Sequence, residues 1–140
     1  FTLHKDASKP AVFLAGGIGI TPFRSIVEFA SQERLKHKIY LFYSNRTKAQ
    51  TAFIGDFEKW ANENKNFIFI PTLTQPDDSR WPHETGRIDG NMLRKHTGRD
   101  FGSAIFYLAG PPAMVSAMRE ILDQAGIDEL RIRTEEFSGY

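Results

Sequence analysis

The stretch Gly16-Gly17-Ile18-Gly19-Ile20-Thr21-Pro22 follows a short apolar run at residues 11–15 and precedes a segment with helical periodicity. A continuous apolar run of this length is typical of a parallel strand that is buried on both faces. Beyond the glycines, apolar residues at positions 23, 26, 27 and 30 predict one buried helical face, with Pro22 as the first helical residue. The order strand, glycine turn, helix therefore predicts a turn at the amino end of a helix.

Such a turn is suited to a phosphate group. Glycines let the backbone bend sharply and come close to a ligand, and the helix start offers N–H groups and the positive end of the helix dipole. The same turn can also do no more than pack a helix against a strand. The residue pattern of this one turn leaves both interpretations open.

The rest of the chain alternates apolar runs with helix-like segments. We expect further strands at residues 39–43, 67–70, 104–109 and 130–134, and helices around residues 53–61, 90–97 and 114–125. In the second helix Phe53 is predicted to face the core. Asp89 is predicted to cap the third helix, and Gly98 and Gly126 to end the third and fourth. Residues 74–90, rich in turn-forming residues, predict a long loop.

This alternation predicts an α/β fold with three layers. We expect a parallel, Rossmann-like sheet of five strands in the order 3-2-1-4-5, with helices on both faces. The length of 140 residues fits one domain.

Composition excludes several classes of function. The net charge of +1 argues against a nucleic-acid-binding face, and the absence of cysteine excludes disulfides and thiolate metal sites. No apolar run is long enough for a membrane span. The absence of cysteine does not fix the redox compartment, but a cytoplasmic enzyme is the plain interpretation. The four histidines, at positions 4, 37, 83 and 96, are scattered, so we expect surface or loop positions for them and no metal site.

Three ordered motifs resemble those of the ferredoxin–NADP reductase superfamily. Residues 16–23 resemble its nucleotide-binding signature, residues 109–114 its Cys-Gly-Pro-x-x-Met segment, and residues 135–137 its Glu-x-Phe ending. Residues 1–3 resemble the end of the connection that leaves its flavin domain. The resemblance implies that residues 1–140 form an NAD(P)-binding domain and that an amino-terminal FAD-binding β-barrel is missing from this chain.

In this superfamily a reduced nicotinamide passes hydride to FAD, and the protein supplies position and electrostatics. The resemblance implies that the flavin domain is joined in cis and that electrons go to an acceptor such as a ferredoxin, an iron–sulfur protein or a haem protein. We expect the isolated chain to be inactive. The alternative is a non-catalytic nucleotide-binding or sensing module in a larger redox complex.

The resemblance also implies a set of site residues. It places the pyrophosphate and the nicotinamide against Gly16, Gly17, Gly19, Ile20, Thr21 and Pro22, with Gly110, Pro111, Pro112 and Met114 as the opposite wall. Phe137 is expected to pack towards the flavin, and Glu135 to be a catalytic carboxylate that orients the carboxamide or serves a proton path. Plainer roles stay open: a helix cap for Thr21, a core position for Met114 and a solvated acid for Glu135.

Ala109 departs from the pattern, because the superfamily often has cysteine there, near the reacting carbon of the nicotinamide. We expect hydride transfer to persist with alanine at this position.

The choice between NADPH and NADH depends on the end of the second strand, where an acid repels a 2′-phosphate and an arginine attracts it. The segment Ser44-Asn45-Arg46-Thr47-Lys48 carries no acid, which favours NADPH through Arg46 and Lys48, with hydrogen bonds from Ser44 or Thr47. Arg46 could equally stack on the adenine or remain a surface cation, so NADH stays open.

Overall fold

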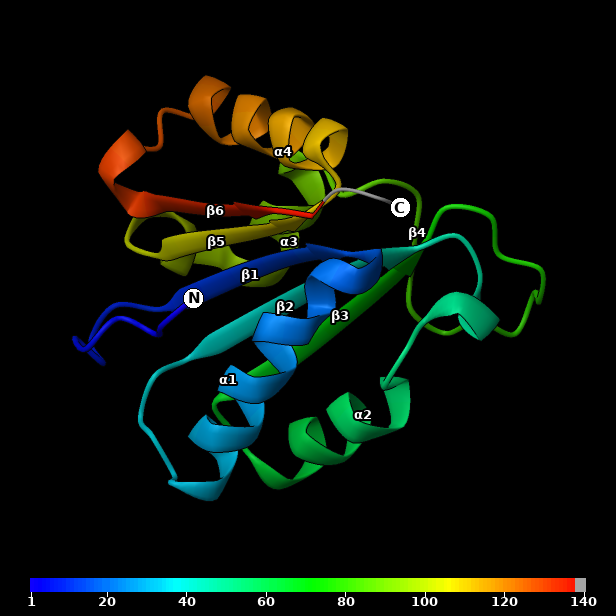
Figure 1. Cartoon of the computed structure of the whole chain (residues 1–140), viewed down its shortest axis with the longest axis horizontal. Helices are drawn as coiled ribbons and strands as arrows, with labels where there is room; N and C mark the ends of the chain where they lie inside the picture. The colour runs from blue at the N-terminus through cyan, green and yellow to red at the C-terminus, as the bar shows by residue number, and fades with distance from the viewer. Residues whose placement is uncertain (138–140) are drawn as a thin grey trace.

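The computed structural model describes residues 1–137 and shows one parallel sheet with helices on both faces (Figure 1). The sheet order is β4-β3-β2-β1-β5-β6, and every neighbouring pair is parallel. The strands are β1 (Ala11–Gly16), β2 (Ile39–Asn45), β3 (Phe67–Leu73), β4 (Glu84–Thr85), β5 (Ile105–Gly110) and β6 (Ile132–Glu136).

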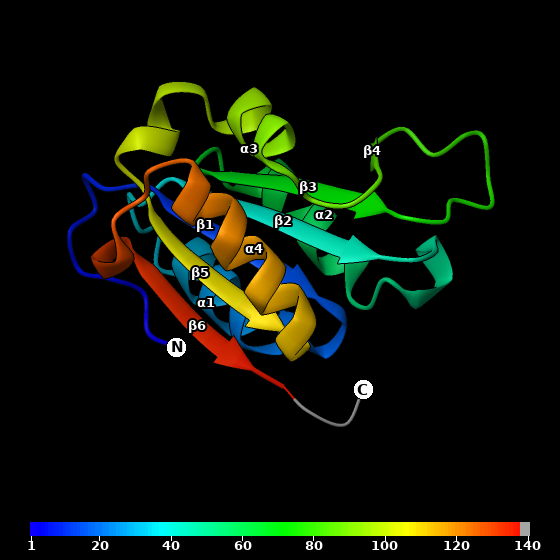
Figure 2. The ribbon, with the colours of Figure 1, turned by 90° about the horizontal axis from the view of Figure 1, so that it is seen from above.

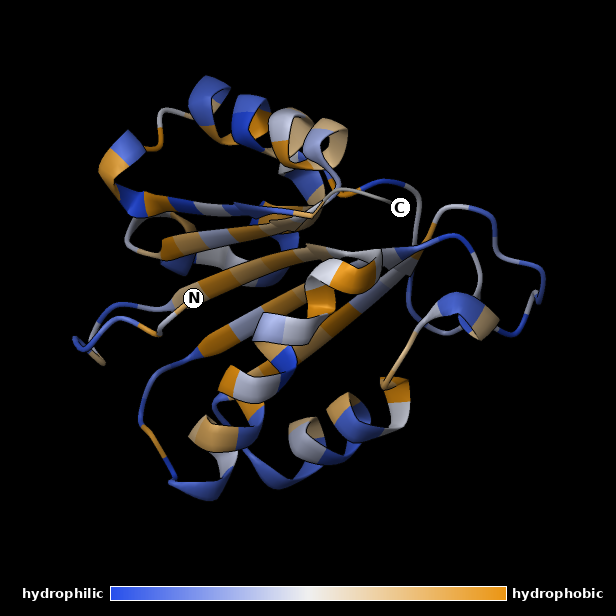
Figure 3. Ribbon diagram, viewed as in Figure 1, coloured by the Kyte–Doolittle hydropathy of each residue, from blue (hydrophilic) through white to orange (hydrophobic). Residues whose placement is uncertain are grey.

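The helices form the two outer layers. As Figures 1 and 2 show, α1 (Ile20–Gln32) and α2 (Ile54–Glu63) cover one face, while α3 (Gly90–Thr97) and α4 (Pro112–Gln124) cover the other. Alternate residues of β1 enter different cores: Phe13 belongs to the cluster that contains Phe23 and Trp60, whereas Leu14 belongs to the cluster that contains Met118. Figure 3 shows the apolar strands between helices whose outer faces are polar. Burial on both faces therefore explains the unbroken apolar runs of the central strands.

The five predicted strands lie in the predicted order, but the prediction of a five-stranded sheet was wrong because β4 adds a sixth. Its two residues lie inside the segment predicted as loop, and they pair with Thr72 and Leu73 of β3. Two hydrogen bonds fix the pairing: the Gly86 N–H donates to the Leu73 carbonyl (2.8 Å), and the Thr72 hydroxyl to the Gly86 carbonyl (2.7 Å). A strand this short has no periodicity for a sequence pattern to detect.

Helix boundaries were predicted in part. Asp89 caps α3 as predicted, because its carboxylate accepts the Met92 N–H at 2.8 Å. Gly98 and Gly126 have positive φ angles where α3 and α4 end. The start of the first helix was wrong: α1 begins at Ile20, so Pro22 is its third residue. Proline is tolerated there because the first-turn N–H groups have no partner within the helix.

Two further predictions need correction, and a third holds with one qualification. Phe53 does not lie in the helix with its side chain inward: it is the N-cap of α2, has left-handed backbone angles and is 46% exposed. The last strand begins at Ile132, because a 3-10 turn capped by Asp128 occupies residues 129–131. His37 lies in the loop before β2, as a surface or loop position predicts, but it is buried there (7% exposed), and its Nε2 lies 2.7 Å from the His4 carbonyl oxygen.

Two kinds of feature are absent from residues 1–137. None of the helices described there is long and apolar enough to cross a bilayer. Within the same residues, no group of three or more His, Asp or Glu side chains is arranged to hold a metal ion.

Candidate functional site: a cavity at the carboxyl ends of the strands

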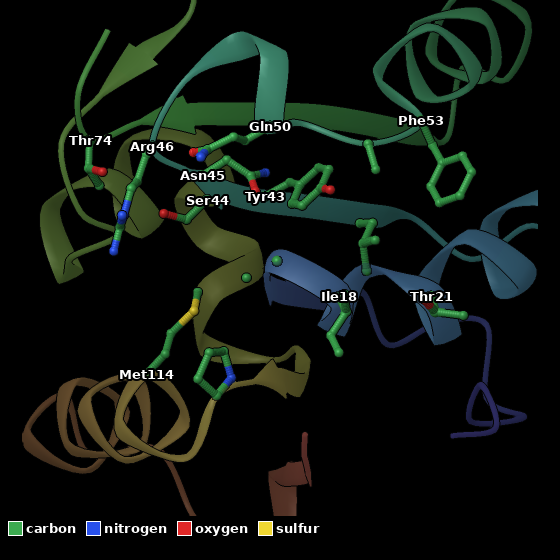
Figure 4. A pocket seen from close by; sticks show the side chains of 15 residues that line it. Ile18, Thr21, Tyr43, Ser44, Asn45, Arg46, Gln50, Phe53, Thr74 and Met114 are labelled. Atoms are coloured by element: carbon green, nitrogen blue, oxygen red, sulfur yellow. The ribbon is translucent and has the colours of Figure 1, made fainter. Parts of the chain in front are cut away.

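A cavity of about 630 Å³ opens where β1, β2 and β5 end (Figure 4). This volume lies in the range of small-molecule and cofactor sites, and the edge of the sheet is the one where open α/β folds bind ligands. The lining residues come from the glycine turn, the end of β2, the start of α2, the loop after β3 and the start of α4: Gly16, Gly17, Ile18, Ile20, Thr21, Tyr43, Ser44, Asn45, Arg46, Gln50, Ala52, Phe53, Thr74, Pro111 and Met114.

The glycine turn forms one side of the cavity. Gly17 has a φ angle of 55°, a left-handed conformation that glycine adopts without strain, and it begins a single 3-10 turn ending at Gly19. Helix α1 starts directly afterwards. The Ile20 N–H already donates to the Gly17 and Ile18 carbonyls, and Pro22 has no N–H, so Thr21 is the first-turn residue whose N–H can serve an anion. Thr21 is exposed, and no side chain caps this helix, whose N-cap is Gly19.

The turn packs against the end of β5 more closely than a side chain would allow. A Cβ atom placed on Gly19 would lie 2.3 Å from the carbonyl oxygen of Ala109. A Cβ on Gly16 would lie 2.0 Å from the sulfur of the flexible Met114 side chain, which would have to move, and one on Gly110 would lie in ordinary contact, 3.5 Å from Gly16 backbone atoms. The glycines at 16, 19 and 110 therefore join the predicted turn and the predicted opposite wall into one surface.

The end of β2 supplies the polar side of the cavity. Arg46 is exposed at the rim, and the loop after β3 is attached beside it: the Thr74 N–H donates to the Asn45 carbonyl and the Gln75 N–H to the Arg46 carbonyl, both at 2.9 Å. The side-chain Nδ2 of Asn45 is buried without a hydrogen-bond partner. A buried donor of this kind costs stability, so its position next to a cavity fits a site that receives a polar ligand.

Lys48 lies outside the lining, on an exposed 3-10 turn that follows Arg46. Its charge reaches the loop after β3, where the pKa of Asp78 is held below its ordinary value by hydrogen bonds from Arg80 and, to a smaller extent, by Lys48. Of the two basic residues predicted to attract a 2′-phosphate, the structure brings only Arg46 to the cavity.

Several lining residues were not predicted, and Phe53 is the most informative of them. Its ring borders the cavity from the start of α2, and the guanidinium carbon of Arg24 lies 4.6 Å from the ring centre. The others are Ile18, Tyr43, Gln50, Ala52 and Thr74. The only sequence signal for Gln50, Ala52 and Phe53 was their place after the second strand, on the same edge as the glycine turn.

The other predicted site residues lie near the cavity without lining it. Glu135 stands on β6 beside Ala109, half buried, with Oε2 3.5 Å from the Phe1 nitrogen. The Phe137 N–H donates to the Gly110 carbonyl at 3.0 Å, so the chain after β6 returns to the end of β5. Gly19, Pro22, Lys48, Gly110 and Pro112 are likewise absent from the lining. Ser138, Gly139 and Tyr140 lie outside the described residues.

These features suit one elongated ligand that carries phosphate. A helix start favours anions, a guanidinium pairs with phosphate oxygens, and an exposed aromatic ring is a surface on which a planar base can stack. Thr21 and Arg46 lie on different sides of the same cavity, as Figure 4 shows, so a ligand with two anionic regions would contact both. A dinucleotide has this pattern of groups.

Comparison with known proteins agrees with this interpretation of the cavity. The model of the oxidoreductase NAD-binding domain family matches residues 13–120. The chain is 32% identical over 141 residues to one subunit of the Na(+)-translocating NADH-quinone reductase of Idiomarina loihiensis, an alignment covering 96% of this chain and 34% of that protein. The chain thus spans about a third of the length of this curated relative.

Solved structures give the same result. A flavohemoglobin of Malassezia yamatoensis, with bound FAD and haem, superposes with a TM-score of 0.83 and 29% identity, over 97% of this chain and 33% of that one. A cytochrome P450 reductase of Amycolatopsis superposes with a TM-score of 0.79 and 26% identity, over 95% and 39%.

The match covers the glycine turn, the strand ends that border the cavity and most of α4, and the overall fold agrees over almost the whole chain. The chain therefore belongs to the oxidoreductase NAD-binding domain family and is an NAD-binding domain of the ferredoxin–NADP reductase superfamily.

Proposed function

We propose that this domain binds NADH or NADPH in the cavity and positions the nicotinamide for hydride transfer to FAD held by a flavin domain of the same polypeptide, in the cytoplasm. Electrons then pass to an acceptor such as a ferredoxin, an iron–sulfur protein or a haem protein. The observation that carries the proposal is the cavity itself, which joins the glycine turn, the start of α1 and Arg46 at the carboxyl edge of the sheet.

In this proposal the chain's own residues bind and orient the nucleotide. The Thr21 N–H, at the positive end of the α1 dipole, holds the pyrophosphate. Gly16 and Pro111 border the nicotinamide end, where glycine lets a ring approach the backbone. Glu135, one strand further along the edge, orients the carboxamide. FAD supplies the hydride acceptor when it is bound, and this chain supplies proximity.

The names of the relatives support the proposed transfer of electrons from the nucleotide through a flavin to an acceptor. One belongs to an NADH-quinone reductase, one is a flavohemoglobin with bound FAD and haem, and one is a cytochrome P450 reductase. In each case the present chain matches about a third of the protein or slightly more. A flavin-binding region joined in cis is therefore part of the proposal.

The alternative is a nucleotide-binding module without catalysis, and Ala109 is the observation that favours it. This residue is fully buried in β5 and presents a methyl group where the superfamily often has a thiol. A full-length polypeptide that oxidises NAD(P)H with bound FAD would refute this alternative. A full-length polypeptide that binds both cofactors without transferring hydride would support it.

Titration of the 140-residue chain with NADP⁺ and with NAD⁺ by calorimetry tests the assignment. We expect weak binding, because a flavin domain joined in cis would wall one side of the cofactor. Arg46→Ala should weaken NADP⁺ binding about tenfold, since a charge-assisted hydrogen bond contributes about 1.5–3 kcal/mol, and should change NAD⁺ binding by less than about threefold.

Arg99→Ala is the control, since this exposed arginine lies in the 3-10 turn after α3 and away from the cavity lining. Equal losses for the two nucleotides on Arg46→Ala would rule out a contact with the 2′-phosphate. Absence of binding by either nucleotide at millimolar concentration would refute the assignment of the cavity.

A further inference from the structure

We infer that Arg24 is a positioning residue for the nucleotide's base, because it fixes the ring of Phe53 at the rim of the cavity. The inference rests on the proposed function, since it takes the cavity as the dinucleotide site. Arg24 itself does not line the cavity, so its effect on the ligand must act through Phe53.

Three side chains contact the guanidinium of Arg24. Its Nη2 donates to Asp56 Oδ2 at 3.0 Å and its Nε to the same oxygen at 3.3 Å. The guanidinium carbon lies 4.6 Å from the centre of the Phe53 ring and 5.8 Å from that of Trp60. All three partners belong to the start or the body of α2, so one side chain of α1 is bound to the helix that begins at Phe53.

Phe53 is held in a conformation that large residues rarely adopt. Its φ and ψ angles are 63° and 18°, and no side chain caps the helix that follows. A bulky residue in the left-handed region costs about 1–3 kcal/mol, and such strain gathers at sites of function. The ring is nevertheless 46% exposed, so burial of the ring does not repay this strain.

An exposed aromatic ring beside a nucleotide cavity is suited to stacking on a base. Stacking of a base on an aromatic side chain is worth about 1–3 kcal/mol when measured by alanine substitution. The benefit depends on a ring that already stands in place, because a free side chain must lose rotamer freedom when the ligand binds. The guanidinium of Arg24 covers part of the ring and restricts it, which leaves the remaining surface to border the cavity.

Arg24 also connects the two ends of the cavity. It stands on α1 one turn after Thr21, whose N–H is the proposed pyrophosphate donor, and it binds the first turn of α2 through Asp56. This side chain therefore links the phosphate site to the aromatic surface, in addition to the core that α1 and α2 share. The structure assigns to Arg24 a role in recognition of the adenosine half of the ligand.

A double-mutant cycle measures this role. The dissociation constants of ADP-ribose and of nicotinamide mononucleotide are determined for the 140-residue chain and for Arg24→Met, Phe53→Ala and the double variant. Arg24→Met keeps the length of the side chain and removes the guanidinium. We expect it to weaken ADP-ribose about fivefold and Phe53→Ala to weaken it about tenfold. The double variant should be no weaker than Phe53→Ala alone.

Two controls separate positioning from a general loss of structure. Nicotinamide mononucleotide lacks the adenine, so its affinity should stay within about twofold in every variant. Arg94→Met removes a matched contact on the other face of the sheet, where the guanidinium carbon lies 5.0 Å from the Phe101 ring centre, and should leave both affinities unchanged. Circular dichroism verifies that each variant is folded.

The outcomes are distinguishable. A fivefold loss from Arg24→Met that persists in the Phe53→Ala background would show that Arg24 contacts the ligand directly, and the inference would be wrong. ADP-ribose binding that Arg24→Met leaves unchanged would also overturn the inference while the proposed function stands. Failure of the unaltered chain to bind ADP-ribose would overturn the proposed function and, with it, this inference.

Discussion

Replacement of Gly19 by alanine is expected to destabilise the domain by roughly 3 kcal/mol and to abolish nucleotide binding. The added Cβ would lie 2.3 Å from the Ala109 carbonyl oxygen and 2.7 Å from the Gly110 nitrogen. Both are backbone atoms at the end of a buried strand, so no side-chain rotation relieves the clash. The turn would have to move away from β5, and the cavity between them would change shape. Urea unfolding followed by circular dichroism measures the loss.

Gly55→Ala is the matched control. Gly55 lies in the first turn of α2, and a Cβ placed there meets no atom within 4 Å. Alanine is the better helix former, so this variant should be more stable by about 0.5–1 kcal/mol. If Gly19→Ala unfolds at the same urea concentration as the unaltered chain, the close packing of the turn against β5 is wrong.

Tyr107→Phe is expected to cost about 2 kcal/mol, the second largest effect, because it removes the buried hydroxyl at the centre of a partly buried hydrogen-bond network. The Tyr107 hydroxyl accepts the His4 N–H and an Arg133 N–H, each at 2.9 Å. With these two donors on its oxygen, the hydroxyl directs its own proton to His4 Nδ1, also at 2.9 Å. The His4 ring then donates from Nε2 to the Lys9 carbonyl at 2.8 Å.

Ser8→Ala is the control for loss of a hydroxyl. The Ser8 hydroxyl donates to Asp6 on the surface, where water replaces the lost bond, so the change should stay within about 0.5 kcal/mol. Equal free energies of unfolding for Tyr107→Phe and the unaltered chain would mean that the network does not hold the amino-terminal segment to the sheet.

The same network predicts how stability depends on pH. Burial lowers the pKa of His4 below the ordinary value of 6.5, and the charges of His37 and Arg133 act in the same direction, against the Lys9 carbonyl and Asp6. The unfolded chain therefore takes up a proton at a higher pH than the folded chain. The contribution of neutral His4 to the free energy of unfolding is fully present above pH 6.5. It is lost as the pH falls from there towards the lowered pKa of the folded chain.

Unfolding free energies at pH 7.5 and pH 5.5 measure this effect. His4→Gln should flatten the difference between the two, whereas His83→Gln, at an exposed loop residue, should leave it as it is. An unchanged difference in His4→Gln would assign the pH dependence to other groups.

The sequence patterns predicted the sheet well because its central strands are buried on both faces. An apolar run such as residues 11–15 has one stable environment, between two helical layers, and right-handed crossovers then leave few strand orders. The position of β4 could not be predicted in this way, because two residues, Glu84 and Thr85, are too few to show a hydrophobic periodicity. Their pairing with Thr72 and Leu73, distant in the sequence, decides their conformation.

The candidate site was predicted where backbone geometry is local and missed where it depends on packing. Gly16, Gly17 and Arg46 line the cavity because a turn and a strand end place them there. Phe53 was misplaced because the apolar spacing that continues at Phe57 and Trp60 also fits position 53. Only the left-handed backbone, which no pattern reveals, turns its ring out of the helix.

The two edges of the sheet have a consequence for self-association. An open edge strand offers unpaired N–H and C=O groups on which another chain can add a strand and start aggregation. At one edge, β4 has only two residues and Pro71 deprives β3 of a donor. Pro82 to Glu84 line a surface pocket together with residues 68–70. At the other, β6 carries Arg133, Glu135 and Glu136. Both edges are therefore poor templates for the addition of a strand. The apolar central strands are thereby protected from aggregation with other copies of the chain.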